Sequence, residues 1–236
     1  ETGWGGVGTY TYHLAQGLAA QGHQVHVVAQ SLNGPQRMAD GAVTVHRIVH
    51  RGWWVPKRAL KEWALRMEYS FLVSRAVREL IRRERIDVVE APNTTGEGFV
   101  YSLGKTAPLV TRLHTHFSEV VRLCGWKKTF DHTLCCTIED AAVANSDLVT
   151  CSTRAHQALI TQEMGIALRR TDHIPLGVPL PLPNGPALEL PHPAVLFVGR
   201  LEKRKGVHVL LQAIPRVLAE VPEAQFFLAG RDTFDD

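Results

Sequence analysis

Residues 194–206 read AVLFVGRLEKRKG, and this stretch predicts the start of an α/β domain. Its first five residues are apolar, as in a strand of a parallel sheet that is covered on both faces. A basic, glycine-flanked loop follows, and residues 207–220 then show the apolar spacing of an amphipathic helix. Open α/β sheets bind ligands beyond the carboxyl ends of their strands, so the loop is expected at a ligand-binding edge.

Two cations in this loop are candidates for binding an anion. Arg200 offers a planar fork that matches phosphate oxygens, and Lys205 adds a point charge five residues later. The N-terminal end of the following helix also favours negative charge. The competing interpretation is a solvated basic loop, which is how most short Lys/Arg clusters behave. The order strand, Gly-Arg, Lys-Gly and helix favours the anion site.

The rest of the chain shows the same alternation of strands and helices. The expected strands lie at residues 25–29, 43–49, 86–90, 109–113, 148–151, 172–175, 194–198 and 224–229. The expected helices cover residues 7–21, 57–85, 133–144, 153–165 and 207–220. Tyr10 is expected on the apolar face of the first of these helices, and Phe71 on the apolar face of the second. Such alternation predicts βα units and a doubly wound parallel sheet.

Two domains are expected from this pattern. Residues 1–175 form the first, the proline- and glycine-rich residues 176–193 form a linker, and residues 194–236 begin the second. A strand should precede the glycine-rich opening of the first domain, and the second domain stops before its third strand. We therefore expect that both ends of the chain are cut.

Composition excludes several classes of protein. The chain has 236 residues, 45% of them hydrophobic, and a net charge of +3 from 26 basic and 23 acidic residues. A charge balance this close to neutral argues against a nucleic-acid binder. The four cysteines form no C-x-x-C pair and are expected to be free thiols. Apolar runs stay below 18 residues, so we expect no membrane-spanning segment. Residues 93–95 match a glycosylation sequon outside any secretory context.

The opening glycines invite a dinucleotide interpretation. Gly3, Gly5 and Gly8 match G-x-G-x-x-G, but the strand that should precede this motif is missing and the next strand ends at Gln30 without an acidic residue. Both departures disfavour NAD. Backbone amides at Gly5 and Gly6 could still approach an anion at a helix N-terminus. The alternative is a tight turn that merely starts a helix.

A second conspicuous feature is an aromatic pair beside a basic helix. Trp53 and Trp54 precede the helix expected at Lys57–Arg85, which carries nine basic and four acidic residues. Such a combination can dock weakly on an anionic membrane surface. The competing interpretation is a solvated helix face with the tryptophans in the core, and charge runs usually favour it.

Several segments together resemble glycosyltransferase family 4. In the second domain they are VGRL at 198–201, KG at 205–206, LLQA at 210–213 and FLAG at 227–230. In the first they are GGV at 5–7, LA at 14–15, GHQV at 22–25, Glu139 with ANSD at 144–147 and Ser152, and HIPLGV at 173–178. The last is similar to the family's I-P-N-G-V, with Leu176 in place of Asn. The resemblance covers nearly the whole chain.

The resemblance implies a GT-B architecture of two Rossmann-like domains, the first lacking its first strand and the second truncated. It implies that Arg200 and Lys205 hold the donor diphosphate and stabilise the leaving group in place of a metal. Gly5 and Gly6 would lie against the same phosphates or the acceptor. His114 matches the histidine that contacts the transferred sugar; its alternative is a structural hydrogen bond.

Two further residues are set aside. His114 and His116 are spaced like metal ligands, but no Cys, Asp or Glu cluster accompanies them, so no metal is expected. Glu139 is assigned no chemistry, since a charged residue in a helix is commonly on its surface.

The expected activity is that of a retaining glycosyltransferase (EC 2.4). It would move a sugar from a nucleotide-diphosphate sugar to an unidentified hydroxyl acceptor, a glycan, glycolipid or small molecule, without a further cofactor. The family's paired glutamates lie beyond Asp236, so residues 1–236 are expected to be inactive alone, and the location cytoplasmic, at most peripheral to the inner face of the membrane. Alternatives are a GT-B sugar-nucleotide epimerase or phosphorylase, or a non-catalytic ligand-binding relative, which has no need of Arg200 and Lys205.

Overall fold

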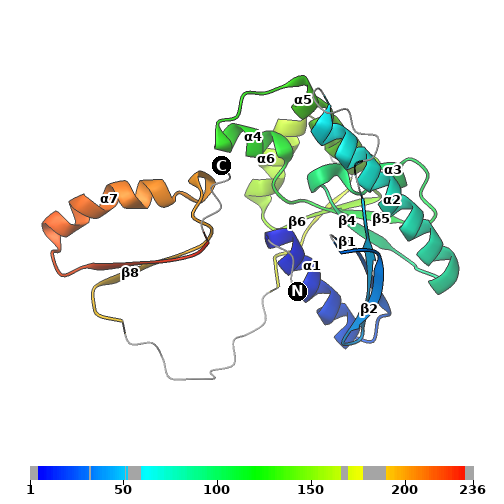
Figure 1. The fold of residues 1–236 in the computed structure, drawn as a ribbon, viewed down its shortest axis with the longest axis horizontal. Helices are drawn as coiled ribbons and strands as arrows, with labels where there is room; N and C mark the ends of the chain where they lie inside the picture. The colour runs from blue at the N-terminus through cyan, green and yellow to red at the C-terminus, as the bar shows by residue number, and fades with distance from the viewer. Residues whose placement is uncertain are drawn as a thin grey trace. The chain divides into compact units, whose positions relative to one another are not determined.

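A computed structural model describes residues 5–31, 33–50, 52, 60–165, 170–177 and 190–231. The chain divides into two compact units, Glu1–Val121 with Lys127–Pro179 and Arg122–Trp126 with Leu180–Asp236. Figure 1 labels many of the helices and strands of each unit. Most of the predicted linker lies outside the described residues, so the predicted domain boundaries stay a prediction.

The first unit contains a three-stranded sheet in the order β1-β3-β2. Strands β1 (Val25–Gln30) and β3 (Val43–Ile48) are parallel, with Val25 opposite Val43. Strand β2 (Gln36–Asp40) pairs antiparallel with β3 and is exposed along its whole length. The sequence pattern does not predict β2, because apolar and polar residues do not alternate along it.

A second sheet of the first unit has four parallel strands in the order β4-β5-β6-β7. These strands are β4 (Val89–Pro92), β5 (Leu109–Arg112), β6 (Leu148–Cys151) and β7 (Thr171–His173). Their common direction confirms the predicted parallel sheet. All four carboxyl ends therefore meet at one edge, which is where side chains that follow the strands gather.

Helices cover these strands. They are α1 (Gly6–Ala20), α2 (Lys61–Glu84), α3 (Phe99–Ser102), α4 (Phe117–Cys124), α5 (Phe130–Ala144) and α6 (Arg154–Met164), with a short 3-10 turn η1 at Thr94–Gly96. Helix α1 packs on β1 and β3, while α2 packs on α3, α5 and η1. Helix α5 begins at a capping box in which Thr129 accepts a hydrogen bond from the backbone of His132.

The core consists of two clusters on the four-stranded sheet. Residues of β6, α5 and α6, with Leu113 directly after β5, form one, and residues of β4, α3 and β5 form the other. Their buried members are Leu113, Val143, Val149, Cys151 and Ile160 in the first, and Ala91, Tyr101 and Leu109 in the second. Burial of apolar area at about 25 cal/mol per Å² is what holds sheet and helices together.

The long helix α2 departs from its predicted bounds and burial. Residues 57–59 lie outside the described residues, as do Trp53 and Trp54. Phe71, expected on the apolar side, is 53% exposed, whereas Glu68, Ser70 and Ser74 are buried. That part of the prediction is wrong, because polar side chains of α2 face the interior. The strand expected at 86–90 likewise begins later, at Val89.

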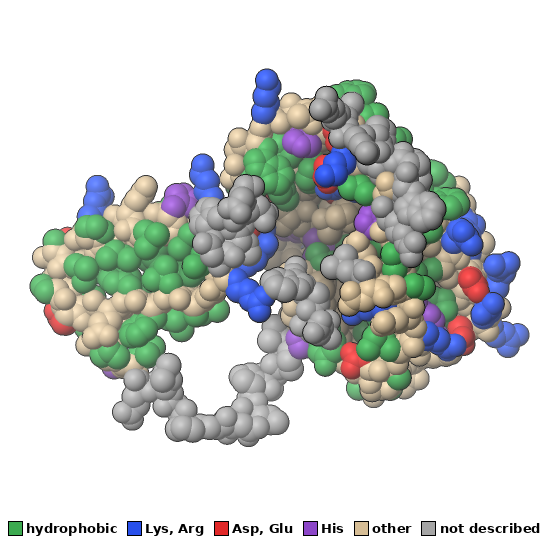
Figure 2. All heavy atoms as spheres, in the orientation of Figure 1, with side chains coloured by type: hydrophobic (Ala, Val, Ile, Leu, Met, Phe, Trp, Pro, Cys, Tyr) green, Lys and Arg blue, Asp and Glu red, His purple; other side chains and the backbone are tan. Residues whose placement is uncertain are grey.

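Between residues 190 and 231, the second unit forms a βαβ motif. Strands β8 (Ala194–Val198) and β9 (Gln225–Ala229) are parallel and flank helix α7 (Val207–Glu220) in the sequence, as predicted. Many of its apolar side chains are exposed, and Figure 2 shows them as green patches. They include Val195, Leu196, Val198, Val209, Leu211 and Leu228.

Candidate active site

The carboxyl ends of β4 and β5 bring Asn93 and His114 into contact. The backbone N–H of Asn93 donates to the carbonyl of Arg112 at 3.1 Å, which continues the ladder between the two strands. The side-chain Oδ1 of Asn93 then accepts from the backbone N–H of His114 at 2.6 Å. Asn93 is fully buried, so the sequon at 93–95 offers no glycan acceptor in the folded protein.

The His114 imidazole lies in a half-buried, electrostatically positive setting. Burial, the largest cause, together with the nearby Arg112 and His156 lowers its pKa from the ordinary 6.5 to about 4. Its Nε2 is buried and has no hydrogen-bond partner among the described residues. At neutral pH the ring is therefore uncharged, with one nitrogen left to accept or donate a hydrogen bond.

Tyr10 connects helix α1 to this edge of the sheet. Its ring meets the His114 ring edge-on, with centroids 5.3 Å apart, and its hydroxyl donates to Glu90 Oε1 at 2.9 Å. The guanidinium carbon of Arg112 lies 4.9 Å from the centre of the same ring. Arg112 is only 1% exposed, so this cation–π contact stabilises a charge that water cannot reach.

The predicted glycines lie at the start of the same helix. Gly5 caps α1 with φ +139, which favours glycine, and its carbonyl accepts from the backbone of Thr9. Gly6 is the first helical residue, so its N–H is among those without a partner inside the helix. Through Tyr10, the structure brings this helix and His114 together; contact of the glycines with phosphate or acceptor stays a prediction.

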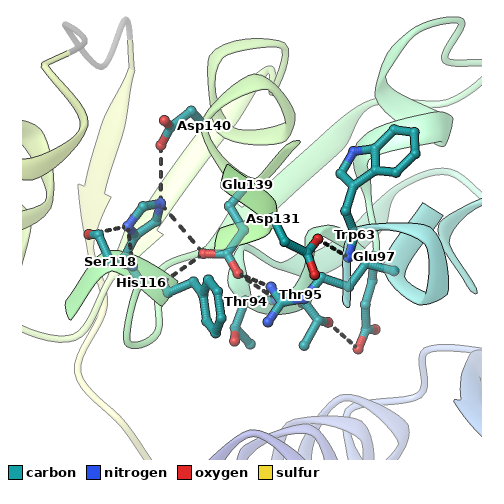
Figure 3. Close-up of polar contacts among 11 residues, drawn as sticks. Trp63, Thr94, Thr95, Glu97, His116, Ser118, Asp131, Glu139 and Asp140 are labelled. Atoms are coloured by element: carbon teal, nitrogen blue, oxygen red, sulfur yellow. Dashed lines mark hydrogen bonds and ion pairs between the residues drawn. The ribbon is translucent and has the colours of Figure 1, made fainter. Parts of the chain in front are cut away.

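Glu139 is a buried anchor, and its interpretation as a helix-surface charge is wrong. The side chain is 0% exposed, and its two oxygens contact α2 and the loops after β4 and β5 (Figure 3). Oε1 accepts from Arg66 Nη1 at 2.9 Å and from the backbone of Thr95 at 2.8 Å. Oε2 accepts from the backbone of Phe117 at 2.9 Å.

His116 joins this cluster rather than pairing with His114. Its Nε2 lies 3.1 Å from Asp140 Oδ1 and 3.5 Å from Glu139 Oε2, and its Nδ1 lies 2.7 Å from the Ser118 hydroxyl (Figure 3). Within the described ranges, no group of three or more His, Cys, Asp or Glu side chains could hold a metal ion.

The second unit carries the two predicted cations in the loop between β8 and α7. Arg200 directly follows Gly199 at the end of β8, and Lys205 closes a 3-10 turn, η2 (Lys203–Lys205), before Gly206 caps α7. Both side chains are exposed, as an incoming anion requires. The structure thus places the two cations on one short loop, at the edge expected for ligands.

An acidic residue of the same loop holds Arg200. Glu202 Oε1 lies 3.1 Å from Arg200 Nη2 and 2.9 Å from Arg204 Nη2. One carboxylate oxygen thereby pairs with one of the guanidinium nitrogens that Arg200 could offer to an anion. The sequence motif does not predict this contact, because the motif is defined by glycines and basic residues and does not include Glu202.

The loop is also held against the end of β9. The backbone of Gly199 donates to the Ala229 carbonyl at 3.0 Å, and that of Leu201 donates to the Arg231 carbonyl at 2.8 Å. A Cβ added at Gly230 would collide with the carbonyl oxygen of Gly199. Glycine at position 230 is therefore required for the two loops to approach each other.

Tyr10, Asn93 and Arg112 belong to the site but were not among the predicted site residues. Tyr10 stood on the expected apolar face of its helix, and Arg112 lay inside an expected strand. The sequence marks Asn93 only as part of a sequon. Its position directly after a strand was the one signal that could have identified it, because the carboxyl ends of parallel strands share an edge.

The parallel sheet of the first unit, with His114 at its carboxyl edge, and the βαβ motif of the second unit, with Arg200 and Lys205 in its first loop, are those of an α/β protein of the GT-B class. The sequence profile of Glycosyltransferase Family 4 matches residues 4–181, and that of Glycosyl transferases group 1 matches residues 192–236. The chain therefore belongs to Glycosyltransferase Family 4, which confirms the resemblance drawn from its motifs.

Known relatives agree with this assignment. A glycogen synthase of Mycobacterium tuberculosis is 27% identical over 98% of this chain and 59% of its own length. A phosphatidyl-myo-inositol mannosyltransferase of Mycolicibacterium smegmatis is 24% identical over 98% of the chain and 57% of its own. The chain thus spans less than two thirds of these curated relatives.

Solved structures confirm the fold class. The sucrose-phosphate synthase of Thermosynechococcus elongatus superimposes with a TM-score of 0.72 at 20% identity, over 98% of this chain and 59% of that one. An alpha,alpha-trehalose-phosphate synthase of Burkholderia vietnamiensis gives 0.59 at 16% identity, over 96% and 63%. Among the described residues, no helix combines the length and apolar character needed to cross a membrane.

Proposed function

We propose that the protein is a retaining glycosyltransferase that moves a sugar from a nucleotide-diphosphate sugar to an acceptor hydroxyl. The observation that carries this proposal is the pair of exposed cations, Arg200 and Lys205, on the loop between β8 and α7. Family membership supports the same reaction type, and the retained configuration rests on the family resemblance. Relatives named as a glycogen synthase and a mannosyltransferase are by name sugar-transferring enzymes.

The two cations of the second unit and the neutral His114 of the first unit have the charges that such a transfer requires. When the bond between sugar and diphosphate breaks, negative charge develops on the diphosphate, and the two cations would stabilise it without a metal. The sugar meanwhile gains positive, oxocarbenium-like character. A neutral His114 can accept a hydrogen bond from a sugar hydroxyl without repelling that charge, whereas an imidazolium would oppose it.

Donor turnover by the full-length protein tests the proposal. The protein would be incubated with UDP-, GDP-, ADP- and TDP-sugars and a mixed acceptor extract, and nucleoside diphosphate release would be recorded. We expect release from one donor, with Arg200→Ala and Lys205→Ala each slower by about a hundredfold or more, the usual effect of removing one transition-state stabiliser. Lys203→Ala is the matched control, because it removes an exposed cation from the same turn and should change little.

Other outcomes would favour the competing activities. Inversion of a sugar carbon with the nucleotide retained would indicate an epimerase, and release of a sugar phosphate that depends on inorganic phosphate would indicate a phosphorylase. Donor binding without turnover in the presence of acceptor would indicate a binding protein. The anomeric configuration of the product, read by NMR, tests retention. Residues 1–236 alone serve as a further control, for which we propose no turnover.

A further inference from the structure

Glu139 holds two loops that emerge at the same edge of the four-stranded sheet. Its Oε1 accepts from the backbone N–H of Thr95, in the turn η1 that follows β4, and its Oε2 accepts from that of Phe117, the first residue of α4, where the loop after β5 ends. Figure 3 shows the carboxylate between them, reaching out from helix α5. One side chain thus fixes the separation of two loops that belong to neighbouring strands.

These loops are the ones that carry His114. Asn93, which accepts from the backbone of His114, lies two residues before Thr95, and His114 lies three residues before Phe117. Glu139 and Asn93 therefore hold the short segment 114–117 at both of its ends. A displacement of Phe117 would be transmitted over three residues to the imidazole.

The charge of Glu139 is compensated on the α2 side. Arg66 donates to Oε1 at 2.9 Å, and its guanidinium carbon lies 4.1 Å from the centre of the Phe117 ring. Arg66 thus contacts both the carboxylate and the residue that the carboxylate holds. A buried charge is costly unless it is paired and hydrogen-bonded, and here α2 and the two loops supply both kinds of partner.

This geometry requires a side chain with two acceptor oxygens; burial raises the pKa of the Glu139 carboxyl, while Arg66, His116 and the two backbone N–H groups partly offset that rise. Both oxygens must accept, one from Thr95 and one from Phe117, and a carboxylate has acceptor capacity on both. A glutamine has the same shape, but its amide nitrogen would face one of the two backbone N–H groups donor to donor. Glu139→Gln therefore frees one of the loops while leaving the volume of the side chain unchanged.

From this arrangement we propose that Glu139 is the positioning residue of the acceptor-side site, setting the loop that presents His114 to the transferred sugar. The inference rests on the proposed function. Glu139 itself does not touch the sugar; it acts through Phe117 and the backbone of residues 114–117.

Asp131 provides a matched control on the same two helices. It lies in the first turn of α5, and its carboxylate accepts from the backbone N–H groups of Glu62 and Trp63 at 3.0 and 2.9 Å (Figure 3). Asp131→Asn thus weakens a carboxylate–backbone contact between α5 and α2 that does not involve the loops of His114.

The experiment measures kcat, the KM of the donor and the affinity for the free nucleoside diphosphate in the full-length protein. For Glu139→Gln we expect kcat to fall about tenfold to a hundredfold, as misplacement of a reacting group by about 1 Å can cost. The affinity for nucleoside diphosphate should stay within about twofold, since Arg200 and Lys205 belong to the second unit. Asp131→Asn should keep the parent kcat.

A double variant separates positioning from general loss of structure. If Glu139 acts through His114, then adding Glu139→Gln to His114→Ala should lower kcat no further, because residues that act as a unit are not additive. Multiplicative losses would overturn the proposal, and so would a parent-like kcat in Glu139→Gln. Should that variant not fold, Glu139→Asp keeps the charge, is one methylene too short to reach both loops, and should show the same pattern.

The two proposals fail in distinguishable ways. A parent protein that releases no nucleoside diphosphate from any donor overturns the transferase assignment, and the role of Glu139 with it. A parent that turns over, with a slow His114→Ala and an unaffected Glu139→Gln, leaves the transferase intact and overturns the positioning role alone.

Discussion

Lowering the pH from 7.5 to 5 should leave His114 almost entirely neutral. Its pKa lies at about 4 instead of 6.5, chiefly because the ring is buried and also because Arg112 is near. At pH 5 a histidine with the ordinary pKa would be about 97% protonated, whereas His114 would be about 10% protonated. Each pH unit corresponds to about 1.4 kcal/mol, so protonating His114 in the folded protein costs about 3 kcal/mol more than in water.

The sign of the stability effect follows from the same shift. The unfolded chain binds a proton at this position near pH 6.5, and the folded chain binds it only near pH 4. His114 therefore contributes nothing adverse above pH 6.5 and makes the fold progressively less stable as the pH falls toward 4, at about 1.4 kcal/mol for each pH unit. His114→Gln should remove that acid sensitivity.

The direct assay is an NMR titration of the imidazole Cε1–H signals in protein with ¹³C-labelled histidine. The His114 signal is assigned by its loss in His114→Gln and should show a midpoint near 4. Arg112→Gln should move this midpoint upward without restoring 6.5, since burial is the larger cause. A His114 midpoint close to 6.5 in the parent protein would refute the reasoning, including the neutral imidazole on which the proposed transfer relies.

Three further predictions concern single substitutions. Glu202→Gln should strengthen nucleoside diphosphate binding by about twofold to fivefold, because it breaks an exposed ion pair and frees Arg200. Binding is measured by calorimetry, and weaker binding in the variant would mean that Glu202 orients Arg200 instead. Burial raises the Glu97 pKa from 4.5 to about 7, so ionisation of this residue lowers the free energy of unfolding as the pH rises from 4.5 to 7. Glu97→Gln should therefore raise the free energy of unfolding, measured by urea denaturation, by up to about 3 kcal/mol at pH 8 and by little at pH 4.5, and equal increases at both pH values would contradict this. Gly96→Ala should destabilise the protein by about 1–3 kcal/mol, because φ at this position is +67 and the new Cβ would lie 2.9 Å from Ile138. The double variant with Ile138→Ala should melt at a higher temperature than Gly96→Ala alone, which would show that the contact with Ile138 is part of the cause.

The elements that the sequence predicts well are those that bury an apolar side. Strands β5, β6 and β8 are short runs of apolar residues between loops, and each lies within one or two residues of its expected place. Strand β2 was missed, since a fully exposed edge strand carries no apolar alternation. Helix α4 was missed for a related reason, because its eight residues are too few to establish a period.

For the candidate site residues, what matters is whether the contacts that define their role are local in the sequence. The sequence marks Arg200, Lys205 and His114 as candidates because each lies in a short local motif that follows a strand. The contacts of Asn93 and Glu139 join residues 21 to 73 apart in the chain, so no local pattern contains them. Periodicity also assigns polar residues to the surface, and it therefore misplaces a buried carboxylate.

The buried polar network and the proposed chemistry are connected through the charge of one imidazole. A sugar that becomes cationic in the transition state calls for a neutral His114, and burial is the main cause that keeps it neutral. A loop that is buried next to charged Arg112 must be held in one place, because a small outward shift would hydrate the ring and restore an ordinary pKa. Asn93 and Glu139 supply that restraint from the two ends of the loop. Weakening either anchor should therefore raise the His114 pKa as well as slow the transfer, so that the two effects appear together in the same variants.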